Sequence, residues 1–248
     1  MPLVFRYAEW RRSAAAERPP AVDESGVPIP PPHLIMLVLG HTDWRAFLGG
    51  EAALRVYADA AARNGVDFAA ARRVLDLGCG CGRLARHLPK ATSAEIYGAD
   101  YNPQLARWCA RNLHGTFTVN QNLPPLDYAD GFFDVIYLNS VFTHQRLQTQ
   151  NAWLAEFCRV LRPGGLALVT FHDEDHASVP KVGLSRADVV ARGLIVHNDR
   201  AEGSNFMATY QSRAFARAQF GAVLDVAEIT PSNETGLSQA LAVLRRPA

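Results

Sequence analysis

Three glycines at alternate positions follow an aspartate in the pattern D-x-G-x-G-x-G at residues 76–82. The apolar run 73–77 predicts a strand before them, and a helix is expected to begin at Arg83. Glycines at such a turn permit positive φ angles and let backbone N–H groups approach a ligand that lies on a helix N-terminus. The spacing therefore predicts a cofactor-binding loop.

The same loop argues against a nicotinamide dinucleotide as the ligand. A dinucleotide fingerprint has the form G-x-G-x-x-G, and counting from Gly78 and Gly80 its third glycine would fall at Arg83. The Arg83 side chain would obstruct the close packing of helix on strand that a glycine permits there. A nicotinamide cofactor is therefore disfavoured.

Asp100 ends the next predicted strand, 22 residues after Gly78. In nucleotide-binding α/β folds, an acidic side chain at this place accepts hydrogen bonds from ribose hydroxyls. The alternative is a solvated turn aspartate before Asn102 and Pro103, which make a good helix start. Together, the loop and the acid favour a ligand that contains a nucleoside.

These residues need a sheet whose strands end at a common edge. From residue 73 to 172, short apolar runs alternate with helical segments, which is typical of a parallel sheet built from right-handed βαβ units. The link between the last two runs is too short for a crossover helix, so these strands are expected to be antiparallel. The predicted fold class is α/β: a Rossmann-like, seven-stranded, mostly parallel sheet with a C-terminal antiparallel hairpin strand and helices on both faces. The predicted strands are 73–77, 95–100, 116–120, 133–139, 166–172, 222–230 and 237–245.

The chain divides into an N-terminal part, residues 1–65, and a main domain, residues 66–248. Six prolines between 13 and 32 exclude a continuous helix and predict an extended arm, and 33–65 reads as covering helices that stop at Gly65. In the arm, Tyr7 and Trp10 are placed to close over a substrate. Residues 173–210 lack long apolar periodicity and are predicted to be an irregular lid or substrate loop.

The loop and Asp100 resemble those of class I S-adenosylmethionine-dependent methyltransferases. Residues 117–126, 133–144 and 161–165 are similar to later motifs of a bacterial subgroup often labelled type 11, 12 or 25, and 30–35, 47–50 and 243–246 are also similar. The likeness covers most of residues 28–246. It implies S-adenosyl-L-methionine as the cofactor and S-adenosyl-L-homocysteine as the product.

The resemblance also implies roles for particular residues. The loop would hold the methionine part of the cofactor, Asp100 its ribose, and Asn120 with Gln121 its adenine, while 139–144 would face the methionine end and the substrate. Many family members carry aspartate in the adenine region where this chain has asparagine, but an amide still donates and accepts. Tyr101 would lie along the adenosine, or else be an exposed turn aromatic. The predicted cofactor-binding residues are Asp76, Gly78, Cys79, Gly80, Gly82, Asp100, Tyr101, Asn120, Gln121 and Asn139.

His144 and His172 are the candidate catalytic residues. They follow the fourth and fifth strands, where ligands bind outside the carboxyl ends of a parallel sheet. Methyl transfer needs alignment and exclusion of water, and a base only when the acceptor must lose a proton early. His144 is preferred because it follows the strand nearest the expected methyl group, and the alternative for each histidine is a structural role.

The run from His172 to His176 contains three acidic residues and could suggest a divalent metal. Adjacent residues cannot all converge on one ion without a special loop. A solvated lid hinge is therefore preferred, and no metal is predicted.

Charge and composition limit the classes of partner that we expect. Lys and Arg total 25 against 24 for Asp and Glu, so no general field would attract nucleic acid or an anionic membrane. The four cysteines show neither a zinc pattern nor disulfide density, and the start lacks the apolar run of a signal peptide. We expect a soluble cytoplasmic protein with no nucleic-acid or membrane partner.

The predicted function is methyl transfer to an oxygen or nitrogen of a small metabolite, such as a specialised metabolite or a sugar. Two alternatives stay open. One is a methyltransferase of protein or RNA, which would ordinarily carry a basic surface or a further binding module. The other is a non-catalytic nucleoside-binding module, because fold does not fix function.

Overall fold

A computed structural model describes residues 18–199 and 202–248. The first part of the predicted arm, with Tyr7 and Trp10, lies outside this range. Within the described chain, residues 18–31 contain no helix, as the prolines predict, and no helix is long and apolar enough to cross a membrane.

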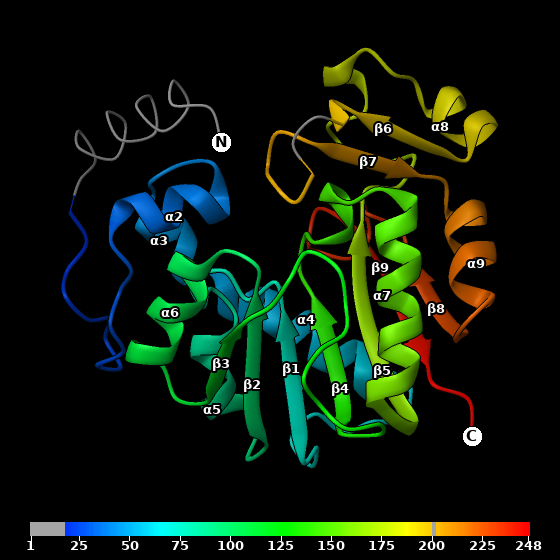
Figure 1. Ribbon diagram of the computed structural model, residues 1–248. Helices are drawn as coiled ribbons and strands as arrows, with labels where there is room; N and C mark the ends of the chain where they lie inside the picture. Colours follow the sequence, from blue (N-terminus) through cyan, green and yellow to red (C-terminus); the bar gives the residue numbers. More distant parts are fainter. Residues whose placement is uncertain (1–17, 200–201) are drawn as a thin grey trace.

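Seven strands form one central sheet in the order β3-β2-β1-β4-β5-β9-β8 (Figure 1). The first five strands in this order, from β3 to β5, are parallel to one another. Strand β9 runs antiparallel to both β5 and β8. This confirms the predicted fold class, including the antiparallel strand at the C-terminus. The strands are β1 (Arg73–Leu77), β2 (Glu95–Asp100), β3 (Thr116–Val119), β4 (Phe133–Leu138), β5 (Leu161–Phe171), β8 (Asp225–Thr230) and β9 (Ala240–Arg245).

Helices cover both faces of the sheet because successive strand residues point to opposite sides. In β4, Val135 and Tyr137 face the core that contains α4 (Gly50–Arg63) and α6 (Pro103–Asn112). Ile136 and Leu138 face the core that contains α7 (Leu147–Val160) and α9 (Arg213–Gly221). All six residues of β4 are buried, as expected of a central parallel strand.

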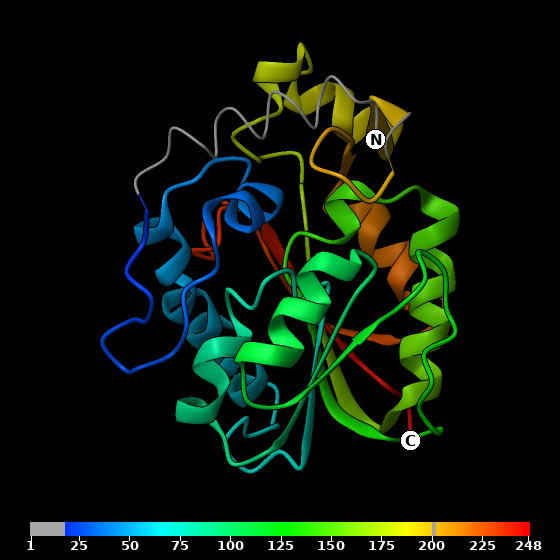
Figure 2. The same cartoon turned by 60° about the vertical axis from the view of Figure 1, so that its left-hand side comes forward.

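Within the described residues, two further helices precede α4 and join the first core. In α2 (Pro32–Leu39), Leu34, Ile35 and Met36 are buried. The N-terminus of α3 (Trp44–Leu48) is capped by Asp43, whose carboxylate accepts from the N–H groups of Arg45 and Ala46. Gly65 follows α4 with a φ of 75° and ends it as predicted. Figures 1 and 2 show α2 and α3 beside the carboxyl ends of β1 and β2.

The predicted helix from Arg83 is only partly correct. A turn runs to Leu84, followed by the 3₁₀ segment η1 (Ala85–His87) and the single-turn α5 (Leu88–Ala91). Pro89 has no N–H and cannot bond to the carbonyl of Ala85, so one continuous helix is interrupted there.

Residues 173–210 are more regular than predicted. They contain η3 (Pro180–Val182), α8 (Arg186–Arg192) and an antiparallel pair, β6 (Leu194–His197) with β7 (Ala208–Gln211). Val179, Val189, Ile195 and Tyr210 form a small separate core. Each element spans seven residues or fewer, too short for its periodicity to stand out in the sequence. Figure 1 shows this subdomain above the carboxyl ends of the strands.

The acidic run after β5 is not the solvated hinge that the sequence suggested. Asp173 is fully buried, and its Oδ2 lies 2.6 Å from Nη1 of Arg213 at the start of α9. Ser232 donates to its other oxygen, and Glu174 and Asp175 also pair with Arg213. Since burial of a carboxylate requires partners, this network anchors the subdomain to the sheet.

Candidate functional site

The predicted site residues gather at the edge where β1, β2, β4 and β5 end. The loop leaving β1 is fastened to β2 by backbone bonds, in which Gly78 N and Cys79 N both donate to Ala99 O. The Gly80 N–H donates to Oδ2 of Asp100 over 2.8 Å. The glycine loop and Asp100, 20 residues apart in the sequence, are therefore in direct contact.

Glycine is required at two positions of this loop. Gly78 and Gly80 have φ angles of 74° and 55°, and a Cβ at either would come within 3 Å of a valine side chain, Val141 and Val38 respectively. Val38 lies on α2, so this N-terminal helix packs directly on the cofactor loop.

Burial raises the pKa of both Asp100 and Asp76. Burial raises the pKa of Asp100 to about 6, although N–H donors from Asn102 and Gly80 oppose the shift. Asp76 is also buried, and its pKa rises to about 7, mainly through burial and further through the charge of Asp100. An additional hydrogen-bond donor at Asp100, such as a ribose hydroxyl, would favour its ionised form.

The other loop residues have mainly packing roles. Cys79 is buried beside Cys109 of α6, and its hydrogen bond with Cys109, followed by burial, raises its thiol pKa well above the usual value. A Cβ on Gly82 would lie 2.2 Å from a methyl carbon of Leu113 and 3.3 Å from the Cys109 sulfur. Both positions therefore hold the loop against α6.

Asn120 and Gln121, which the sequence predicts to lie near the adenine, differ in their environment. The Asn120 amide nitrogen donates to Gln121 O, whereas its Oδ1 is buried with no partner in the described chain. Gln121 is exposed, and Tyr101 is 44% exposed with its hydroxyl 2.6 Å from Gly203 O. Asn120 thus offers a free buried acceptor, while Tyr101 meets the loop after β6.

On the other side of β1, Asn139 follows β4 and accepts a hydrogen bond from the hydroxyl of Tyr57. Tyr57 lies on α4, is fully buried, and also contacts Leu138 O over 3.1 Å. Sequence reasoning missed Tyr57. The only available signal was its place on α4 beside Val56, in the periodic run of that helix.

His144, at the end of η2 (Phe142–His144), is held by the backbone of Met207 over 2.6 Å. A carbonyl only accepts, so Nδ1 of His144 carries the proton and Nε2 has the free lone pair. Burial lowers the His144 pKa, which the bond to Met207 opposes in part. The ring is therefore neutral at pH 7.

His172, directly after β5, lies 6.5 Å from His144 between ring centroids. It stacks on His176 at 3.9 Å and lies beside Tyr210. Burial lowers its pKa well below the usual value, and the charges of His176 and His144 add to this. Its Nδ1 is buried without a partner among the residues described.

Residues 202–207, here called the strap, cross this edge of the sheet. Gly203 N donates to His144 O, and Gly203 O accepts from Tyr101, so one residue bridges the ends of β4 and β2. Asn205 donates to Leu37 O on α2, and Glu202 pairs with Arg146 over 2.8 Å. No sequence signal identified the strap, because these contacts join residues that are distant along the chain.

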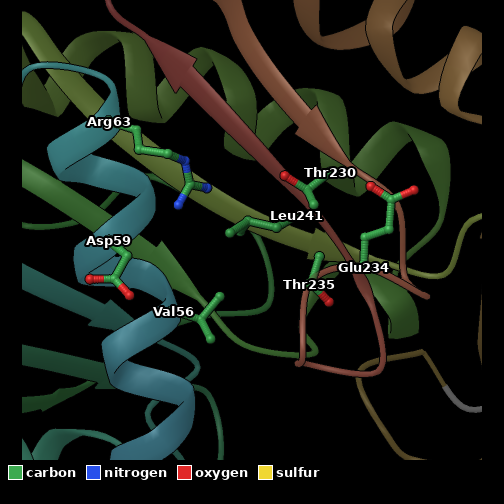
Figure 3. A pocket seen from close by; sticks show the side chains of 7 residues that line it. All are labelled: Val56, Asp59, Arg63, Thr230, Glu234, Thr235 and Leu241. Carbon is green, nitrogen blue, oxygen red and sulfur yellow. The ribbon is translucent and has the colours of Figure 1, made fainter.

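A cavity of about 170 Å³ lies elsewhere, between α4 and the connection from β8 to β9 (Figure 3). None of the predicted site residues lines it. In the described ranges, no group of three or more His, Cys, Asp or Glu side chains is arranged to hold a metal ion. The cavity is lined by Val56, Asp59, Arg63, Thr230, Glu234, Thr235 and Leu241.

Comparison with known proteins agrees with this geometry. The family model described as "Methyltransferase domain" matches residues 74–165, from β1 into β5. Residues 74–165 of the chain therefore match a methyltransferase domain. The match contains the loop, Asp100, Asn120, Asn139 and His144.

Two relatives are methyltransferase GfsG of Streptomyces halstedii, 31% identical over 136 residues, and a fatty-acid O-methyltransferase of Mycolicibacterium smegmatis, 33% identical over 121 residues. The alignments cover 52% and 47% of this chain and 42% of each relative. Other matching methyltransferases are named for a hydroquinone and for tRNA U34.

The fold also matches the structure of Burkholderia thailandensis 1,6-didemethyltoxoflavin-N1-methyltransferase, which has bound 1,6-didemethyltoxoflavin and S-adenosylhomocysteine. The TM-score is 0.59 at 19% identity, covering 94% of this chain and 100% of that one. This likeness supports the fold of the whole methyltransferase unit.

The Asp100 pKa predicts how binding of S-adenosylhomocysteine depends on pH. A carboxylate accepts ribose hydroxyls better than a neutral carboxyl, so affinity should be constant above about pH 7 and fall roughly 10-fold by pH 5. Isothermal titration at several pH values measures this, and Asp100→Asn should lack the step.

Titration of Asp100 does not destabilise the fold at low pH, so unfolding caused by Asp100 cannot explain a loss of affinity there. Its folded pKa lies above that of the unfolded chain, so its contribution to the unfolding free energy rises as pH falls through 6. An identical pH profile in wild type and Asp100→Asn would contradict the assignment of the ribose to Asp100.

Proposed function

We propose that this protein transfers a methyl group from S-adenosylmethionine to an oxygen or nitrogen of a small metabolite, such as a specialised metabolite or a sugar. The observation that carries the proposal is the buried contact between the glycine loop and Asp100, which makes one continuous receptor for a nucleoside ligand. We further propose that the protein works in the reducing cytoplasm. Its four free cysteines support this.

The residues present fit the cofactor. Asp100 would accept from the ribose, and the unpaired Oδ1 of Asn120 is a suitable acceptor for an exocyclic amino group of adenine. Gly78 and Gly80 would bring backbone close to the methionine part, with Asn139 beyond them. When bound, the cofactor supplies a methyl group on a sulfonium, so the protein needs no covalent nucleophile of its own.

We propose His144 as the general base for an acceptor hydroxyl. Its Nδ1–H is engaged by Met207 O, which leaves the lone pair of Nε2 available for the proton that the hydroxyl loses. His172 would lie beside it as a second neutral imidazole. Its unpartnered buried Nδ1 could accept or donate a hydrogen bond to a polar acceptor molecule.

The subdomain 173–210 would serve as the lid over the acceptor. The strap joins Tyr101, beside the ribose acid, to His144, the proposed base, so closure of the strap would orient the base and cover the cofactor at once. A covered site excludes water and favours a small acceptor. It also disfavours a large polymer that must reach the methyl group.

Transfer of a labelled methyl group into cell extract tests the proposal. We expect label in the small-molecule fraction, and mass analysis would identify the product. Label in tRNA or protein would overturn the small-metabolite assignment in favour of the polymer alternative. Binding of S-adenosylhomocysteine without label in any fraction would instead support a non-catalytic module.

The matched control for that experiment is Asp100→Ala. Loss of a ribose acceptor should weaken cofactor affinity by about 1–3 kcal/mol while the chain stays folded. NAD should not compete for the site. Tight binding of NAD with no response to S-adenosylmethionine would contradict the assigned cofactor.

His144→Ala should lower turnover of a hydroxyl acceptor roughly 10²–10⁴-fold, with little change in cofactor affinity. In wild type, activity should rise with pH through a group whose pKa lies below the usual value of imidazole, because burial lowers it. A structural role would instead reduce melting temperature and cofactor affinity together. Wild-type turnover in a stable variant would remove His144 from the mechanism.

Tyr101→Phe tests the lid. It removes one hydroxyl that holds Gly203 O and leaves the aromatic ring in place. We expect S-adenosylhomocysteine to dissociate several-fold faster in stopped-flow measurements, since a neutral hydrogen bond contributes about 1 kcal/mol. An unchanged dissociation rate would mean that the strap does not retain the ligand.

A further inference from the structure

Ser140, two residues after the end of β4, has a backbone conformation that is unfavourable for a serine. Its φ angle is 63°, in the left-handed region that residues other than glycine rarely adopt. Such a residue persists where the surrounding structure fixes it, and residues of this kind cluster at functional sites. Ser140 lies between Asn139 and the η2 turn that ends at His144, so its conformation decides how that turn leaves the sheet.

Three hydrogen bonds hold Ser140 in this conformation. Its N–H donates to Oγ1 of Thr170 on β5 over 2.8 Å. Its hydroxyl lies 3.1 Å from Oγ1 of Thr143, a fully buried residue that immediately precedes His144. The third bond comes from Gln239, whose Nε2 donates to the Ser140 hydroxyl over 2.9 Å. Because an amide N–H only donates, Ser140 Oγ accepts this bond and keeps its own hydrogen for Thr143.

Gln239 ends the connection between β8 and β9, residues 231–239, here called the link. It is 99 residues from Ser140 in the sequence and lies outside the part of the chain that matches the methyltransferase family model. At the start of the link, the Ser232 hydroxyl donates to the buried carboxylate of Asp173. The link is therefore joined at one end to the network that anchors the subdomain, and at the other end to the turn after β4.

Stability alone does not explain an amide at position 239. The Oε1 atom of Gln239 is buried with no hydrogen-bond partner among the residues described. An unpaired buried carbonyl is destabilising, whereas an apolar side chain of similar shape carries no such penalty. The chain keeps the amide despite this penalty, and the hydrogen bond that the amide makes within the described residues is the one to Ser140.

We propose that Gln239 is a positioning residue for methyl transfer: by holding Ser140, it fixes the turn that presents Nε2 of His144 to the methyl acceptor. This inference rests on the proposed function, in which His144 is the base. The contacts run from the link through Ser140 to Thr143, the residue before His144. The ring of His144 is in turn held by Met207 O. Gln239 acts through this turn and touches no reacting atom.

The test replaces Gln239 by methionine, which keeps the length of the side chain and removes its amide. The rate measured is the initial transfer of label from saturating S-adenosylmethionine into the small-molecule fraction of cell extract. We expect Gln239→Met to lower this rate about 5- to 10-fold, as for loss of one neutral hydrogen bond. Affinity for S-adenosylhomocysteine should change by less than about 2-fold, because the contact between the glycine loop and Asp100 is untouched. Melting temperature should be unchanged or higher, because the unpaired carbonyl is gone.

A double-mutant cycle measures whether the effect passes through Ser140. Ser140→Gly removes the hydroxyl and still permits the positive φ, because glycine adopts this region readily. In the Ser140→Gly background, Gln239→Met should change the rate by less than about 2-fold. The control is Asn233→Leu, which makes a similar change at an exposed amide of the same link and should leave the rate at the wild-type value. An equal effect of Gln239→Met in both backgrounds would overturn the proposal.

The ring of His144 gives a readout that a merely structural role would not move. In the wild type, Nδ1 carries the proton because it bonds to Met207 O. Nitrogen NMR of the ring, assigned by comparison with His144→Ala, should show this tautomer in the wild type. A mixture of both tautomers is expected in Gln239→Met, because the turn no longer holds the ring against Met207.

A wild-type rate in Gln239→Met would refute the positioning role. A lower melting temperature with an unchanged His144 tautomer would show that Gln239 is structural, and would refute that role as well. Both outcomes leave the proposed function intact. If the wild-type protein transferred no label to any fraction, the proposed function itself would fail, and this inference with it.

Discussion

The site depends on one buried contact, the hydrogen bond from the Gly80 N–H to the carboxylate of Asp100. It joins the loop after β1 to the end of β2 and fixes the two relative to each other. The carboxylate keeps a raised pKa because it is buried, and two backbone donors only partly offset that burial. A ligand that adds hydroxyl donors at Asp100 would therefore stabilise the charged form and the loop together.

The rest of the fold is arranged around this contact. Parallel strands bring Asp100, Asn139, His144 and His172 to one edge, and α2 packs on Gly80 through Val38. The ion-pair network of Asp173 and Arg213 anchors the subdomain that carries the strap. The strap then returns to His144 and Tyr101, so the cover of the site is connected to its proposed base and to its cofactor end.

One charge at the site would be completed by the ligand rather than by the protein. The buried carboxylate of Asp100, on the β2 side, accepts two backbone N–H bonds, yet burial still raises its pKa. A molecule with hydroxyl donors at this end would complement it. Fixed polarity of this kind aligns a methyl donor in one direction, and alignment is the main requirement of displacement chemistry.

The sequence by itself determined the fold class, the glycine turn after β1 and the acid at the end of β2. Those signals are local: glycine spacing, alternation of short apolar runs with helices, and an aspartate at a strand end are set by backbone geometry within a few residues. Tertiary structure decided the burial of Asp173, the tautomer of His144, and the strap across β2 and β4. Each of these depends on which side chains from distant segments meet, and on how much water they exclude, and no local spacing encodes either.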